Sequence, residues 1–218
     1  MPASSPALNP AAANRLLEAA RGHRLEYLFT FMLATGLRLG EALALRWCDV
    51  DLAGGSANVQ HTLEYLTGRP WRIAEPKSAS GKRVVPLIGS ALAGLRAQRD
   101  RQQFDQQRVG EAWQDNDLVF PNALGTPVSP TNAYHEFKKL LARAGLPTTH
   151  GVHDLRHSTA TYLLAAGVDG RIVMSIMGWS QVSMLKRYQH VLSPMLADAA
   201  TRLEAVFPLA ADGGYRGV

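Results

Sequence analysis

The stretch HGVHDLRHSTATYLL, residues 150–164, carries the most informative pattern in this chain of 218 residues. Its spacing puts His153, Arg156 and His157 at positions i, i+3 and i+4, which share one face of an α-helix. The segment predicts a helix over residues 153–166 that Gly167 closes. Two imidazoles and a guanidinium on one helical face make this segment the first candidate for chemistry.

Further helices are predicted on both sides of this segment, from capping residues, apolar periodicity and terminal glycines. Asn9 and Pro10 open the first, and the last begins at Ser193-Pro194. The predicted segments are 10–22, 25–35, a short helix that carries Arg38 and Glu41, 90–108, 130–145, 169–178, one that carries residues 186–190, and 194–207.

The middle of the chain has the residue pattern of strands, not of helices. Residues 57–63 alternate like a strand, and residues 69–74 and 83–87 are two further strand candidates on either side of a polar loop. Three short strands in sequence indicate a small antiparallel sheet. The predicted fold class is α+β and mainly α-helical, with a small three-stranded antiparallel sheet. We interpret residues 1–9 as a linker tail, 10–207 as one domain and 208–218 as a flexible C-terminal tail.

Composition narrows the range of partners and locations. Lys and Arg number 23 against 18 Asp and Glu, which gives a net charge of +5. This excess suits a polyanion such as nucleic acid, although solubility alone would also explain it. The single cysteine, Cys48, cannot form an internal disulfide. The first residues lack the features of a signal peptide, and no apolar run reaches the length of a membrane span, so we expect a cytoplasmic protein.

Other candidate residues lie outside the opening stretch. Arg38 and Glu41 follow a glycine, Lys77 lies in the polar loop, and Tyr188 comes nine residues after Trp179. Each has an ordinary alternative, since such residues are usually surface ion pairs, solvated lysines or core aromatics. None of them indicates a function alone.

Their order along the chain is more informative. The segments TGLRLGEALALRW, PKSASGKRVVPL, HDLRHSTATYLL and MGWSQVSMLKRYQHV follow one another, and together they resemble the conserved boxes of the tyrosine recombinases, the phage integrase family. The resemblance covers residues 10–207. It implies an enzyme that cuts and rejoins double-stranded DNA through a 3′-phosphotyrosine, with no metal or nucleotide cofactor. Such enzymes act as homotetramers on DNA in phage integration or excision, at the nucleoid.

The resemblance also assigns roles to individual residues. It implies Tyr188 as the nucleophile and Glu41 as a supporting residue, with Trp179 at a position where most members have histidine. The implied catalytic set is Arg38, Lys77, His153, Arg156, Trp179 and Tyr188, and Arg83 and Arg187 are expected to contact DNA. Lys82 is the rival to Lys77, and we interpret His157 and His190 as structural.

The chemistry explains why these residue types are needed. A phosphodiester gains negative charge in its transition state, and the guanidiniums of Arg38 and Arg156 can each donate two hydrogen bonds to its oxygens. A phenol has a pKa of about 10, so Tyr188 needs a proton acceptor, for which His153 is the best candidate. Lys77 would protonate the departing 5′ oxygen.

Three alternatives stay open. HDLRH differs by one residue type from the zincin motif H-E-x-x-H, and His150 precedes it, so a zinc hydrolase is one alternative. A DNA-binding relic without activity and a type IB topoisomerase-like enzyme are the others. Family members usually carry a helical DNA-binding domain before the first box, and we therefore interpret this chain as a catalytic fragment.

Overall fold

The computed structural model describes residues 7–65, 71–76 and 79–188. The α-helices are α1 (Pro10–Ala20), α2 (Glu26–Thr35), α3 (Leu39–Leu43), α4 (Gly89–Val109), α5 (Pro130–Arg143), α6 (His153–Ala165) and α7 (Gly170–Met177). The strands are β1 (Val50–Asp51), β2 (Ser56–Val59), β3 (Thr62–Glu64), β4 (Arg72–Ala74) and β5 (Arg83–Pro86). Short 3-10 helices are η1 (Trp47–Asp49), η2 (Ala79–Gly81), η3 (Gly110–Ala112) and η4 (Val182–Tyr188). The mainly helical α+β class is confirmed.

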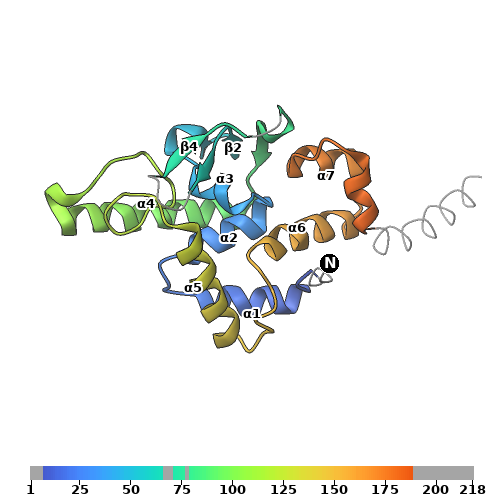
Figure 1. Ribbon diagram of the computed structural model, residues 1–218, viewed down its shortest axis with the longest axis horizontal. Helices are drawn as coiled ribbons and strands as arrows, with labels where there is room; N and C mark the ends of the chain where they lie inside the picture. The colour runs from blue at the N-terminus through green and yellow to red at the C-terminus, as the bar shows by residue number, and fades with distance from the viewer. Residues whose placement is uncertain (1–6, 66–70, 77–78, 189–218) are drawn as a thin grey trace, which may run out of the picture.

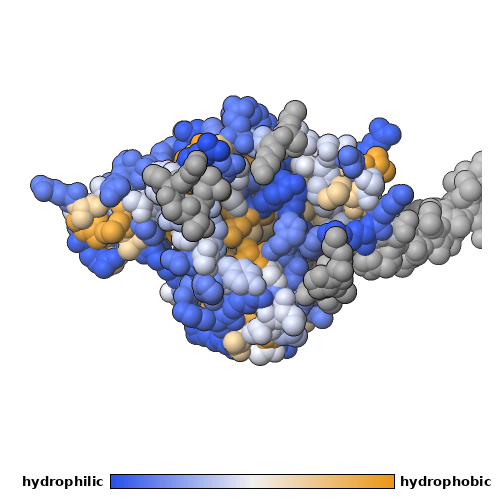
Figure 2. Space-filling model, in the orientation of Figure 1, coloured by the Kyte–Doolittle hydropathy of each residue, from blue (hydrophilic) through white to orange (hydrophobic). Residues whose placement is uncertain are grey.

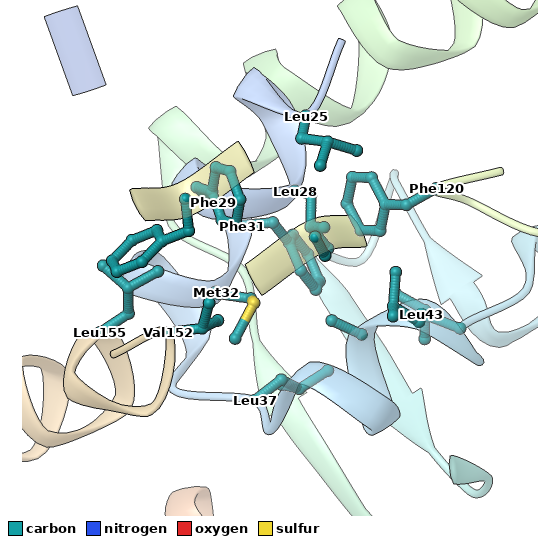
Figure 3. Packing of buried hydrophobic residues seen from close by; sticks show 14 of the residues in the cluster. Leu25, Leu28, Phe29, Phe31, Met32, Leu37, Leu43, Phe120, Val152 and Leu155 are labelled. Atoms are coloured by element: carbon teal, nitrogen blue, oxygen red, sulfur yellow. The ribbon is translucent and has the colours of Figure 1, made fainter. Parts of the chain in front are cut away.

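Helix α2 forms the centre of the main hydrophobic core. Its sequence EYLFTFMLAT is apolar on most faces, as expected for a helix surrounded by other elements. The helix packs against α4 and α6. The ring of Phe29 lies 5.3 Å from that of Phe137 on α5. The ring of Phe31 lies 5.4 Å from that of Phe120, and both are labelled in Figure 3. The strands lie on one side of α2 in Figure 1, and α1 and α5 lie on the other.

The strands form two small antiparallel sheets. The first has the order β1-β2-β5, and the second pairs β3 with β4. A three-stranded antiparallel sheet was predicted correctly, but its membership was wrong. The strand predicted over residues 57–63 is divided between the sheets, and the segment predicted over 69–74 pairs with the second half. Buried apolar residues recur at Ala57, Val59 and Leu63, on both sides of the break between the two strands. The alternation of buried and exposed residues therefore does not show where the chain passes from one sheet to the other.

Helices α6 and α7 build a second hydrophobic cluster beside the main core, at the right of Figure 1. Ala160 and Leu164 of α6 pack there against Val173 and Met177 of α7. Trp179 and Tyr188, which follow α7 in the chain, complete the cluster. This second cluster brings the third and fourth sequence boxes together.

Local signals predicted most helix ends well. Asn9 caps α1 by accepting a hydrogen bond from Ala12 N, and Asp169 caps α7 in the same way. Two predictions need correction. Arg38 is not within a helix but precedes α3 with an extended ψ of 152°, because the Glu41 side chain accepts its backbone N–H. Residues 182–188 form a 3-10 helix where an α-helix was expected.

Several sequence predictions lie outside the described residues. They concern Lys77, His190, the helix over 194–207, the tail over 208–218 and most of the linker over 1–9. Within the described part, no helix is both long and apolar enough to cross a membrane. The face in Figure 2 is mostly hydrophilic, and its hydrophobic patches are small and separate.

Candidate active site

One pocket of about 190 Å³ collects residues from three of the four boxes. Its walls come from the start of α3, one face of α6 and the chain that follows α7. The lining residues are Arg38, His153, Arg156, His157, Trp179, Ser183, Met184, Arg187 and Tyr188. Six of the nine site residues implied by the sequence therefore meet in one place, and Glu41 and Arg83 lie next to them.

Arg156 is the most deeply buried of these residues, at 2% exposure. Its Nη1 donates to the carbonyl of Gly36, 2.6 Å away, and its Nη2 donates to the carbonyl of Met177. These carbonyls end α2 and α7, where the helix dipole favours a cation. Burial and the nearby charge of Arg38 lower the pKa of Arg156 to about 9, which leaves the guanidinium charged at pH 7.

Arg38 lies at the open side of the pocket, with 44% of its side chain exposed. Its Nη1 donates to Glu41 Oε1 at 2.7 Å. Burial would raise the pKa of the Glu41 carboxyl, but hydrogen bonds from Arg83 and Arg38 outweigh it and hold the pKa below its ordinary value. Glu41 is therefore a carboxylate that orients an exposed cation.

Arg83 was expected to contact DNA, and the structure gives it buried partners. Its guanidinium pairs with Glu41, and its Nε donates to the carbonyl of Ile176 at 2.7 Å. A further bond runs to the carbonyl of Gly81 at 3.0 Å. Arg83 thus connects β5 with α3 and α7 underneath the pocket, and a direct contact with DNA stays a prediction.

Tyr188 is almost fully buried, at 3% exposure, and stacks on Trp179 with 5.5 Å between ring centroids. The same indole lies 5.9 Å from the guanidinium carbon of Arg156. Burial raises the pKa of Tyr188, and the charges of Arg187 and Arg156 partly oppose that rise. Trp179 therefore packs between the candidate nucleophile and the buried arginine.

The two histidines of the HDLRH segment take different places. His157 Nδ1 lies 2.8 Å from the hydroxyl of Tyr188, whereas no such bond joins His153 to it among the described residues. His153 lines the pocket, and its ring meets that of His157 edge-on at 4.8 Å. Burial, His157 and the cations Arg156 and Arg38 lower the pKa of His153, so its imidazole is neutral at pH 7.

His157 is the functional candidate that the sequence interpretation missed. We expected a structural, hydrogen-bonding histidine, and it does hydrogen-bond, but to the candidate nucleophile. Ser183 and Met184 also line the pocket without having been predicted. The spacing of His157 and His153 at i and i+4 was the available signal, since it puts both rings on one helical face.

The two candidate lysines cannot be compared directly. Lys77 lies outside the described residues. Lys82 is described, and its Nζ pairs with Glu75 at 2.9 Å on the surface. A role for Lys77 stays a prediction.

The zincin-like pattern does not assemble a metal site in the part of the chain that the structure describes. There, no three His, Cys, Asp or Glu side chains come together as a possible set of ligands. Asp154 instead accepts from Gly151 N at 3.0 Å and lies 3.1 Å from Nδ1 of His150. What the pocket does offer is three guanidiniums, two imidazoles and a phenol, which suit an anionic group.

Comparisons with known proteins agree with this chemistry. The family model described as "Phage integrase family" matches residues 6–194. The chain is 32% identical over 206 residues to a "Tyrosine recombinase XerC-like" protein of Caldanaerobacter subterraneus subsp. tengcongensis, covering 88% of this chain and 52% of that protein. It is 33% identical to an "Integrase" of Saccharopolyspora erythraea, covering 88% and 55%.

A solved structure resembles this one closely. The Tn1549 transposon integrase in complex with transposon right end DNA matches with a TM-score of 0.74 and 25% identity, over 84% of this chain and 61% of that one. The chain spans about half the length of the curated relatives it matches, at 52% and 55%.

Proposed function

Because this chain belongs to the phage integrase family, we propose that it is the catalytic part of a site-specific tyrosine recombinase. The proposed reaction cuts and rejoins strands of double-stranded DNA through a 3′-phosphotyrosine at Tyr188. It needs no nucleotide, because the phosphotyrosine conserves the free energy of the phosphodiester, and we propose no metal cofactor.

One observation carries this proposal. The same pocket contains the phenol of Tyr188 and the guanidiniums of Arg38 and Arg156, although these residues lie up to 150 positions apart in the sequence. Two fixed cations beside a phenol support phosphoryl transfer, because they stabilise the charge that develops on the non-bridging oxygens.

The proposed cleavage step forms a bond between the Tyr188 oxygen and phosphorus and breaks the bond from phosphorus to the 5′ oxygen. His153, neutral at pH 7, would accept the phenolic proton. Lys77 would donate a proton to the departing 5′ oxygen. Trp179 offers one N–H donor and packing, and cannot move protons.

The wider setting is also proposed. We take residues 10–207 as the catalytic domain, and the family match over residues 6–194 supports most of this range. A homotetramer on DNA is the expected assembly, with Arg83 and Arg187 as further DNA contacts. The Tn1549 integrase was solved on DNA, which supports DNA as the partner here. Action on such DNA would occur in the cytoplasm, at the nucleoid.

The test is covalent trapping. A nicked suicide substrate should accumulate a covalent protein–DNA adduct that denaturing electrophoresis detects and protease digestion removes. Tyr188→Phe should abolish the adduct while leaving DNA affinity nearly unchanged. An adduct that persists in Tyr188→Phe would refute the assignment, and bound zinc, or loss of activity with a chelator, would revive the zinc alternative.

A further inference from the structure

Three side chains in the pocket form a chain of hydrogen bonds that ends on the candidate nucleophile. The Tyr188 hydroxyl lies 2.8 Å from Nδ1 of His157, and Nε2 of the same ring lies 3.1 Å from Nη1 of Arg187. His157 comes from α6, whereas Arg187 and Tyr188 are neighbours in η4. The imidazole therefore bridges two adjacent residues of another element.

The partners of the ring determine which nitrogen carries its proton. A guanidinium has only donors, so Nε2 of His157 must accept the hydrogen bond from Arg187. Burial and the charge of Arg187 lower the pKa of His157, which keeps the ring neutral at pH 7. A neutral imidazole with an unprotonated Nε2 carries its proton on Nδ1. That proton points at the oxygen of Tyr188.

We propose that Arg187 and His157 form a donor relay to Tyr188, in which His157 stabilises the phenolate through Nδ1–H and does not act as a base. This inference rests on the proposed function of the same site. His157 touches the reacting oxygen and is the catalytic member. Arg187 is a positioning residue, because it fixes the tautomer of the ring.

The relay acts in both directions of the reaction. During cleavage the phenolic proton passes to His153, since Nδ1 of His157 is already protonated. The developing phenolate then keeps the Nδ1–H hydrogen bond until its oxygen bonds to phosphorus. During rejoining the 5′ hydroxyl oxygen attacks phosphorus and gives its proton to Lys77. The bond from phosphorus to Tyr188 breaks, and the phenolate leaves with the electron pair, stabilised by the same donor.

The surroundings of Tyr188 explain why a donor is needed. Burial raises the pKa of the phenol, and the charges of Arg187 and Arg156 oppose that rise. His153 and Arg38 line the same pocket without a hydrogen bond to the hydroxyl among the described residues. His157 is therefore the described group that contacts the oxygen directly. A base at this position would need a proton on Nε2, which would then face a guanidinium N–H.

The first experiment measures the ionisation of Tyr188 in the protein without DNA. Tyrosine labelled with ¹³C at Cζ is titrated by NMR, and Tyr188→Phe identifies the signal among the six tyrosines. His157→Leu should raise the pKa of Tyr188 by about one to two units, the usual strength of a hydrogen bond to a charged group. His157→Asn places an amide N–H near the position of Nδ1–H and should restore most of the shift.

A substitution of Arg187 gives a second variant, which should fold normally because the Arg187 side chain is exposed. Arg187→Leu should also raise the pKa of Tyr188. The matched control is Lys186→Leu, which removes the same charge one residue away from an exposed position and should shift the pKa less. An unchanged pKa in both His157→Leu and Arg187→Leu would overturn the relay. If Arg187→Leu and Lys186→Leu raised the pKa of Tyr188 equally, Arg187 would act only through its charge, and its positioning role would be wrong.

The second experiment follows cleavage against pH on a substrate with sulfur at the 5′ bridging position, which hardly needs an acid. His157→Leu should be roughly 10-fold slower at pH 7, and the defect should shrink as pH rises toward the raised pKa of the buried phenol. His157→Asn should stay near wild type. If His157→Asn were as slow as His157→Leu, a donor at this position would not be enough, His157 would be a base and the relay would be wrong.

The two experiments separate this inference from the proposed function. Failure of the unmodified chain to form an adduct would refute the recombinase activity, while the titration would still report on the contact. Normal adduct formation with no pKa response to His157→Leu would refute the relay alone.

Discussion

Arg83 holds the carboxylate of Glu41 with two donors, Nη2 at 2.9 Å from Oε2 and Nη1 at 3.3 Å from Oε1. Both side chains are almost completely buried, at 5% and 4% exposure. Because Arg83 also donates to the carbonyl of Ile176, the pair joins α3, β5 and α7. The position of Arg38 depends on the same carboxylate.

We expect Glu41→Ala to destabilise the protein by about 3–5 kcal/mol, since it leaves the buried Arg83 guanidinium without its counter-charge. Chemical denaturation followed by circular dichroism measures the loss. Glu18→Ala is the control, because Glu18 pairs with Arg21 at the surface and should matter little. Similar, small losses in both variants would show that the buried pair contributes no more than a surface one.

The same carboxylate gives a prediction on pH. The folded pKa of Glu41 lies below its ordinary value of 4.5, so the pair stabilises the protein above that pH. This stability should be lost as pH falls through the lower, folded pKa. In Glu41→Gln the acid side of the stability curve should be flatter, and thermal melts between pH 6 and 3 test this. A curve parallel to wild type would contradict the assignment.

The two arginines that we propose to bind phosphate, Arg38 and Arg156, should respond differently to substitution. Arg156→Ala leaves the carbonyls of Gly36 and Met177 without their donors, so it should lower both stability and cleavage. Arg38→Ala removes a side chain that is 44% exposed and should leave stability nearly unchanged, yet cost about 100-fold or more in cleavage. Melting temperatures and single-turnover cleavage measure the two effects.

Substitution of Arg156 by lysine tests whether the shape of the guanidinium is needed as well as its charge. An ammonium is a compact charge and cannot span two carbonyls and a phosphate, so Arg156→Lys should rescue neither property. A fully active Arg156→Lys variant would argue against a guanidinium that serves both the carbonyls and the phosphate.

Features that depend on neighbouring residues could be predicted from the sequence. Asn9 and Asp169 cap α1 and α7 as expected, and Gly36 ends α2 in the left-handed conformation at φ 68°. Such caps involve residues two to four positions apart, so the pattern contains the whole interaction. The candidate site residues came from a different source, the resemblance of the four boxes to a known family, and six of them line one pocket.

Features that depend on distant partners could not be predicted. The burial of Arg83 follows from Glu41 and Ile176, which lie 42 and 93 positions away. The contact of His157 with Tyr188 spans 31 positions and needs the turn after α7. The alternation of apolar and polar residues in a strand also does not identify the strand that pairs with it. For this reason the residues predicted as one strand belong to two sheets in the structure.

His153 should titrate below its ordinary pKa in the free protein and higher on DNA. Burial, His157 and the cations Arg156 and Arg38 all disfavour its protonated form. A phosphate bound by those arginines would offset their charge and raise the pKa of His153. Imidazole NMR titrations with and without a short duplex, assigned with His153→Gln, measure both values. A pKa that falls on DNA binding would contradict a phosphate in this pocket.

The last prediction concerns which lysine donates the proton to the 5′ oxygen. Lys77 was predicted from its place in the polar loop before β5, and its rival Lys82 pairs with Glu75 at 2.9 Å. An alkoxide leaving group is very basic, so Lys77→Ala should slow cleavage of normal DNA by about 10² to 10⁴-fold. With sulfur at the 5′ bridging position the leaving group hardly needs a proton, and Lys77→Ala should cleave almost as fast as wild type. Arg38→Ala should stay slow on both substrates, because the phosphate oxygens still carry charge. Lys82→Ala is the matched control, and if it shows the rescue while Lys77→Ala does not, Lys82 is the acid.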